Sequence, residues 1–114
     1  MSGSFEEEKT RIIAALNDEF RKSFIGGEVY ITVGLNELGS EFVVQAVDAV
    51  KQFDAFTSEY DPYGEHDFGS LNVQEHKLFW KIDYYDPTMK FGSEDPSNAE
   101  LTKRVLTVML AGEY

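Results

Sequence analysis

The sequence predicts an α+β fold in which helices cover a small, three-stranded, mostly antiparallel sheet. Apolar side chains recur every three or four residues in three segments, as on helices, and alternate along three others, as on strands. The length of 114 residues suits one domain and is too short for two ordinary ones. We therefore expect a single domain over residues 1–114, with the element order α-β-α-β-β-α.

The N-terminal half predicts a helix, a strand and a second helix. The first helix is expected over Ser4–Phe24, because Ser4 and Glu7 have capping-box spacing and Gly26-Gly27 can end it. A strand follows over Glu28–Val33, where β-branched and aromatic residues dominate. The second helix is expected over Ser40–Phe53. The buried stripes of the two helices are expected to be Ile12, Ile13, Leu16, Phe20 and Phe24, and Val43, Ala46, Val47 and Val50.

The C-terminal half predicts an irregular loop, a hairpin and a third helix. Regular periodicity stops over Asp54–His66, where Asp, Pro, Tyr and Gly are typical of a loop. Two strands, Asp67–Val73 and Lys77–Tyr85, are close enough to form a hairpin. A third helix is expected from Ser97 to about Gly112, from capping-box spacing at its start and helical spacing of Leu101, Val105, Val108 and Met109.

Charge and composition narrow the classes of partner. With 21 acidic and 10 basic side chains, the net charge of −11 repels nucleic acid and favours a partner protein with a basic surface. The basic side chains of the first helix share it with acids, so we expect a mixed, solvated face there: Lys9, Arg11, Arg21 and Lys22. Cysteine is absent, the N-terminus lacks the pattern of a signal peptide, and no stretch is apolar enough to span a membrane. A cytoplasmic protein without membrane contact is expected.

The predicted loop between the second helix and the hairpin is the most unusual stretch. No lysine or arginine occurs between Lys51 and Lys77, and the six carboxylates of this segment are interleaved with Tyr60, Tyr63 and His66. A cluster at Glu65, His66 and Asp67, joined by Asp83 from the second hairpin strand, could bind a divalent metal or perform acid–base chemistry if the fold brought it together. The alternative is that Asp61 starts a turn and that His66 or Asp67 caps backbone groups in the loop.

The second hairpin strand carries a further candidate surface. Leu78, Trp80 and Ile82 are expected to face the core, so the charged and aromatic side chains between them face outward. Together with the loop, this outward face supplies the predicted binding residues: Glu59, Asp61, Tyr63, Glu65, His66, Asp67, Lys81, Asp83, Tyr85 and Asp86.

Five strings of residues resemble a known family: Ala15–Arg21, Phe53–Phe56, Asp61–Gly69, Phe79–Asp86 and Arg104–Thr107. Together they are similar to DUF3768, a family of small bacterial proteins of unknown function, with a resemblance that extends from about Lys9 to Tyr114. The resemblance implies a gene carried on alphaproteobacterial chromosomes and plasmids near antirestriction genes, and hence a counter-defence role. One departure is the hairpin turn Gln74-Glu75-His76, where relatives are expected to have Asp-Gly.

No phosphate-binding glycine loop, serine elbow or zinc-binding helix pair occurs in the sequence. We therefore expect a non-catalytic, acidic binding protein without a cofactor, with inhibition of a nucleic-acid-handling defence complex as its specific form. Two alternatives stay open. The chain could be a small metal protein or enzyme centred on Glu65, His66 and Asp67, or a self-associating structural module.

Overall fold

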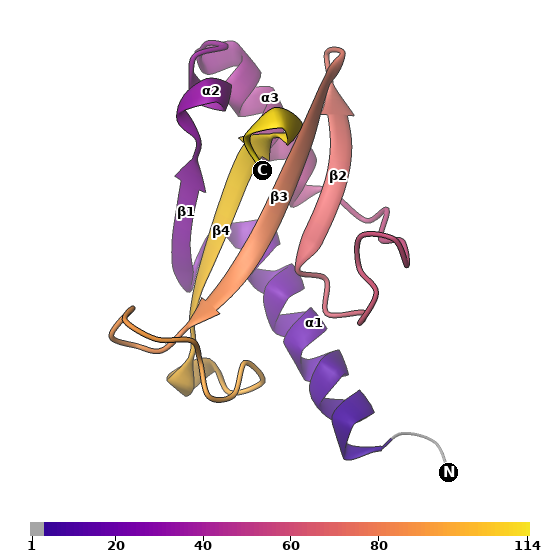
Figure 1. The fold of residues 1–114 in the computed structure, drawn as a ribbon, viewed down its shortest axis with the longest axis vertical. Coiled ribbons are helices and arrows are strands. Elements are labelled where there is room, and N and C mark those ends of the chain that lie inside the picture. The colour runs from indigo at the N-terminus through magenta and orange to yellow at the C-terminus, as the bar shows by residue number, and fades with distance from the viewer. Residues whose placement is uncertain (1–3) are drawn as a thin grey trace.

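A computed structural model describes residues 4–114 and shows an α+β fold built on one four-stranded mixed sheet. Residues 1–3, the start of the acidic segment in which no signal peptide is expected, lie outside the described residues. In Figure 1 the two longer helices lie behind the sheet, and neither covers the face turned toward the viewer. We call this face, on the side opposite the two longer helices, the open face. In the part of the chain from residue 4 onward, no helix has the length and apolar character needed to cross a membrane.

The helices form largely where the sequence predicts them. Helix α1 (Phe5–Ser23) begins with the predicted cap, because the Ser4 hydroxyl accepts a hydrogen bond from the Glu7 amide at 3.0 Å. Its C-terminal cap is Phe24, which has a left-handed backbone conformation with φ of 62°. The left-handed residue thus comes before Gly26-Gly27, where it was expected. Helix α3 (Ser40–Lys51) matches the second predicted helix, and a short α2 (Val33–Asn36) precedes it.

Four strands form the sheet, in the order β1-β4-β3-β2. Their bounds are β1 Gly27–Ile31, β2 Phe68–Val73, β3 His76–Tyr85 and β4 Lys103–Leu110. Strands β2 and β3 form the predicted antiparallel hairpin. Its turn has positive φ at both Gln74 (48°) and Glu75 (73°), so these residues adopt the backbone form that Asn-Gly or Asp-Gly adopts more easily.

The predicted third helix is wrong, and with it the three-stranded sheet and the order α-β-α-β-β-α. The segment forms β4, which lies between β1 and β3, parallel to β1 and antiparallel to β3. Because a central strand is buried on both faces, its apolar residues form a nearly continuous run, in which helical spacing also occurs. Only the 3-10 turns Ala99–Leu101 and Ala111–Glu113 flank β4, and the Asn98 side chain caps the first of them.

The hydrophobic core lies between the sheet and the helices. Side chains of α1 and α3 pack on alternate residues of β3 and β4, and Trp80 of β3 is fully buried as expected. Gly69 of β2 lies against the Trp80 indole, and a Cβ at that position would overlap the ring. Because side chains alternate along a strand, the remaining side chains of β3, including Phe79, Lys81 and Asp83, lie on the open face.

Two polar residues of α1 are also in the core, contrary to the predicted apolar stripe. Asn17 and Arg21 are 0% and 1% exposed, whereas Ile12 is 40% exposed. Arg21 was expected on a solvated face with the other basic residues of this helix. It is buried because its guanidinium finds backbone carbonyls at the end of α3, a contact between segments far apart in the sequence.

Candidate functional site

The acidic loop, residues 54–66, passes around the β2 edge of the sheet (Figure 1). Its last residues reach back to α1, since the imidazole Nδ1 of His66 lies 2.9 Å from the Asp18 carboxylate. Its middle reaches the open face, where the Tyr60 ring packs on Phe68 and Phe79. The predicted site residues of the loop are therefore divided between the two sides of the sheet.

Asp61 holds the loop together. It is buried, and its carboxylate accepts a hydrogen bond from the His66 amide at 3.1 Å. Its own amide donates to the Thr57 carbonyl at 2.7 Å, and its carbonyl accepts from the Gly64 amide. These bonds fix His66 with a positive φ of 57°. Asp61 thus performs the backbone-capping role that was the alternative to a binding role.

His66 and Glu65 are both engaged on the helix side of the sheet. The His66 ring stacks on Phe56, with ring centroids 3.8 Å apart, and its Nδ1 forms a hydrogen bond with the Asp18 carboxylate. The Glu65 carboxylate accepts a hydrogen bond from the Tyr84 hydroxyl at 2.8 Å. Burial raises the pKa of Tyr84 well above its ordinary value, and the bond to Glu65 adds to the increase, so the hydroxyl stays a donor.

A buried polar network that the sequence did not reveal lies beneath these residues. Asn17 donates to the Tyr84 hydroxyl at 2.8 Å and to the Glu65 carbonyl at 2.9 Å, and its carbonyl accepts from Arg104 at 2.7 Å. Arg104 also donates to the Pro96 carbonyl at 2.6 Å. Burial lowers the pKa of Arg104. The only sequence signal was the presence of Asn17 at a helical position expected to be apolar, between Ile13 and Phe20.

The residues of the predicted metal or acid–base cluster do not converge. Glu65 points to Tyr84, His66 to Asp18, and Asp83 forms an ion pair with Lys81 at 2.9 Å on the open face. Within residues 4–114, no group of three or more histidine, aspartate or glutamate side chains could hold a metal ion. The described residues therefore do not assemble the metal cluster expected at Glu65, His66 and Asp67.

The concave part of the open face is an aromatic pocket of about 380 Å³. Its walls include the rings of four residues that contact one another, with centroid distances of 5.2–5.9 Å. These are Tyr60, Phe68, Phe79 and Tyr114, which we call the aromatic pocket residues. The rim adds Pro62, Tyr63 and two carboxylates, Glu59 and Asp67. Of the predicted site residues, Glu59, Tyr63 and Asp67 are brought together here.

Asp67 of this pocket has a raised pKa. Its side chain is half-buried, and in the described residues no other side chain or backbone group donates a hydrogen bond to it. Burial raises the pKa of Asp67 from 3.8 to about 6, and the nearby carboxylates of Glu65, Asp61 and Asp83 add to the shift. Asp67 is thus a residue of the pocket whose carboxylate has no ion-pair partner among residues 4–114.

The other predicted site residues lie away from the pocket. Lys81 and Asp83 pair with each other on β3, which raises the pKa of Lys81 through the hydrogen bond to Asp83. Tyr85 is half-buried farther along the same face. Asp86 follows β3 and caps the next loop, accepting hydrogen bonds from the Thr88 hydroxyl and the Lys90 amide. The bond from Thr88, followed by those from the loop amides, lowers the pKa of Asp86.

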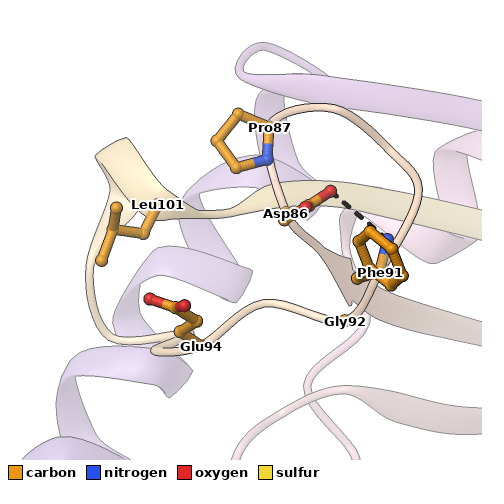
Figure 2. Close-up of a pocket in the computed structure, with 6 residues that line it drawn as sticks. All are labelled: Asp86, Pro87, Phe91, Gly92, Glu94 and Leu101. Carbon is orange, nitrogen blue, oxygen red and sulfur yellow. Dashed lines mark hydrogen bonds between the residues drawn. The ribbon is translucent and has the colours of Figure 1, made fainter.

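A second pocket, of about 390 Å³, lies beside that loop (Figure 2). It is lined by Asp86, Pro87, Phe91, Gly92, Glu94 and Leu101. Figure 2 shows the Asp86 carboxylate directed at the Phe91 amide, with which it forms a hydrogen bond. Since that carboxylate is engaged by its own loop, Glu94 supplies the remaining charged side chain. This pocket offers a ligand fewer free polar groups and fewer aromatic rings than the pocket on the open face.

Comparison with known families identifies the chain's relatives. The family described as "Protein of unknown function (DUF3768)" matches residues 31–113. The chain belongs to DUF3768. The DUF3768 match includes the acidic loop, both hairpin strands and β4, and it begins within β1, so that α1 lies outside it. No curated protein and no solved structure matches the chain.

The raised pKa of Asp67 predicts a stability gain when the charge is removed. The folded-state pKa of about 6 lies above the ordinary 3.8, so the folded chain binds a proton more tightly than the unfolded chain. The stabilisation of the folded chain by the protonated Asp67 is present below about pH 4 and is lost as pH rises through 6. We expect Asp67→Asn to raise the free energy of unfolding by about 1 kcal/mol at pH 7, a value reduced for partial solvent screening.

Urea unfolding of the DUF3768 chain at pH 4, 5.5 and 7 measures this gain. It is expected to be near zero at pH 4 and largest at pH 7. Asp54→Asn, which removes an exposed carboxylate of the same loop, is the matched control and should show no such pH dependence. An equal gain for Asp67→Asn at pH 4 and pH 7 would contradict the ionisation argument.

Proposed function

We propose that this chain is a non-catalytic binding protein whose open face holds a basic surface of another protein. The observation that carries the proposal is an uncovered sheet face with a cluster of aromatic side chains beside unpaired carboxylates. Tyrosine and phenylalanine supply rigid contact area and are enriched at protein interfaces. Tyr30 and Tyr114, which are 50% and 73% exposed, extend the aromatic surface from β1 to the C-terminus.

The charges of the open face support a basic partner. Two of its lysines, Lys81 and Lys103, are already paired with Asp83 at 2.9 Å and Glu28 at 3.6 Å, and a third, Lys77, lies over the Tyr60 and Phe79 rings. Glu59 and Asp67 form no ion pair in the described residues. With a net charge of −11 on the whole chain, the face attracts cations and repels phosphates. Such a field speeds association with a positively charged protein, in a salt-dependent manner.

We further propose that the basic surface is one that otherwise binds nucleic acid. A protein groove lined with lysine and arginine for phosphate contact is complementary to an acidic face of this kind. Occupying the groove would displace the nucleic acid, so the chain would act as an inhibitor of a nucleic-acid-handling complex. This is the physical form that the counter-defence role expected from the family resemblance would take.

Selection of peptides from a displayed random library, with the whole chain as bait, tests the binding function. Enriched peptides are expected to carry net positive charge, and their affinity should fall several-fold between low and high salt. Glu59→Lys/Asp83→Lys on the open face is expected to weaken binding by at least tenfold. Glu19→Lys/Glu37→Lys makes the same change in net charge at exposed positions on α1 and in the turn after α2, and should not weaken it. Selected peptides that are neutral, or equal losses in the two variants, would refute the proposal.

A further inference from the structure

We propose that the aromatic pocket takes one basic side chain, a lysine or an arginine, from the partner protein. The inference rests on the proposed function and adds where and by what chemistry the partner is recognised. The ring faces and edges of Tyr60, Phe68, Phe79 and Tyr114 surround the space, and the rim carboxylates Glu59 and Asp67 lie beside it. Aromatic rings around a cavity with adjoining negative charge are the general chemistry for binding a cation.

A lysine of the chain itself shows that these rings accept a cation. The ammonium of Lys77 lies 5.4 Å from the Phe79 ring centroid and 5.8 Å from that of Tyr60. It also donates a hydrogen bond to the Tyr60 hydroxyl at 3.3 Å. Lys77 is exposed and does not line the pocket, so the interior of the pocket remains available to a second cation.

Asp67 supplies the charge that distinguishes a cation from an apolar side chain. Among the described residues it has no ion-pair partner, and the negative charges of Glu65, Asp61 and Asp83 are near enough to raise its pKa. Glu59 also lines the pocket. The basic groups close by are Lys77 at the pocket edge and Lys81, which is already paired with Asp83. An incoming ammonium or guanidinium would therefore relieve repulsion within this group as well as contact the rings.

Binding is expected to depend on pH through this carboxylate. Because the pKa of Asp67 is about 6 in the free chain, the carboxyl is largely protonated at pH 5 and ionised at pH 7. A cation that prefers the ionised form should bind up to about tenfold more tightly at pH 7 than at pH 5, with proton release between the two. Asp67→Asn should remove most of this difference.

Nuclear magnetic resonance titration of the whole chain with blocked amino acids tests the pocket directly. The probes are the Nα-acetyl methylamides of lysine, arginine and norleucine, the last having the lysine stem without its charge. Shifts at the amides of Phe68, Phe79 and Tyr114 are expected for both cationic probes, with norleucine weaker by about tenfold. Binding of either the lysine or the arginine probe supports the inference. Comparison of the two affinities shows which cation the pocket prefers.

Three variants test where the lysine probe binds. Tyr114→Leu alters a side chain that is 73% exposed, so little folding cost is expected, and it should weaken the lysine probe several-fold. Tyr30→Leu alters an exposed tyrosine of the same face outside the pocket and should leave the probe unaffected. Lys77→Gln should tighten the probe, because it removes a competing positive charge from the pocket edge.

Norleucine binding as tightly as lysine, or equal losses in Tyr114→Leu and Tyr30→Leu, would overturn the inference. Two further outcomes distinguish failure of this inference from failure of the proposed function. Basic peptides that bind the open face in the library selection but are insensitive to Tyr114→Leu and Asp67→Asn would leave the binding function standing and refute the pocket. Cationic probes that bind the pocket while the selection yields only neutral peptides would refute the partner and retain the pocket.

Discussion

Replacing Arg21 by leucine is expected to lower the free energy of unfolding by about 4 kcal/mol. The guanidinium donates to the carbonyls of Val50 at 3.1 Å and Phe53 at 2.8 Å, and to the Asp18 carboxylate at 2.9 Å. Leucine leaves all three acceptors without this donor, two of them in a buried environment. The substitution also removes a positive charge from the C-terminal end of α3, where it interacts favourably with the helix dipole.

Chemical denaturation of Arg21→Leu and Arg11→Leu provides the measurement and its control. Arg11 lies on the same helix but is exposed and bonded only to Glu8, so its replacement should cost less than about 0.5 kcal/mol. Arg21→Lys is also expected to destabilise, because one ammonium cannot reach three acceptors in the fork geometry of a guanidinium. Equal stability of Arg21→Leu and Arg11→Leu would show that the buried contacts contribute little.

Replacing Asn17 by leucine is expected to cost about 3 kcal/mol, which corresponds to a fall in Tm of roughly 15 °C for a domain of this size. Asn17 satisfies three partners at once, namely Tyr84, the Glu65 carbonyl and Arg104. The charged partner matters most, since Arg104 is 4% exposed and its Nε would lose its acceptor. Leucine also lacks the donor that links the acidic loop to α1 through Glu65.

A double-mutant cycle with Tyr84→Phe isolates the Asn17 contribution. If the two residues act in one network, the double variant should lose at least 0.5 kcal/mol less than the sum of the single losses. Asn72→Leu, an exposed asparagine on β2, is the control for composition and is expected to change stability only slightly. Strict additivity of Asn17→Leu and Tyr84→Phe would mean that the two side chains stabilise the fold independently.

The elements predicted correctly are those specified by local patterns. Helix α1 has its cap at Ser4, α3 has a clear apolar stripe, and the two hairpin strands are adjacent in sequence with alternating side chains. Each of these depends on residues within about ten positions of one another. The burial of Trp80 followed from the same alternation along β3.

The prediction failed at β4 because side chains on both faces of that strand are buried. Arg104, Leu106 and Val108 face the helices, and the residues between them pack on the open face. A segment with apolar residues on both faces has no clean two-residue period, and its helical spacing is then as evident as its strand character. Its parallel partner, β1, lies over 70 positions earlier, as in the pairing of Gly27 with Arg104.

The predicted binding residues overlap with the aromatic pocket at three positions, and their binding role stays a prediction. Glu59, Tyr63 and Asp67 do lie at one pocket, whereas Asp61, Glu65, His66 and Asp86 are engaged by backbone or by buried side chains. Phe68, Phe79 and Tyr114 were not predicted as site residues. The sequence does not show which aromatic side chains of different strands contact one another in the sheet. Outward orientation of Phe79 on its strand was the one signal that could have pointed to the pocket.

The sequence by itself determined the charge of the molecule, its local helices and hairpin, its family, and the acidic loop as the segment to inspect. Only the tertiary structure decided that β4 is the central strand, that Asn17 and Arg21 are buried, and that an aromatic pocket beside Asp67 lies on the open face. The physical reason is that propensity, capping and periodicity act over a few residues. The burial of a polar group, or the assembly of a pocket, depends on partners that the chain supplies from distant positions.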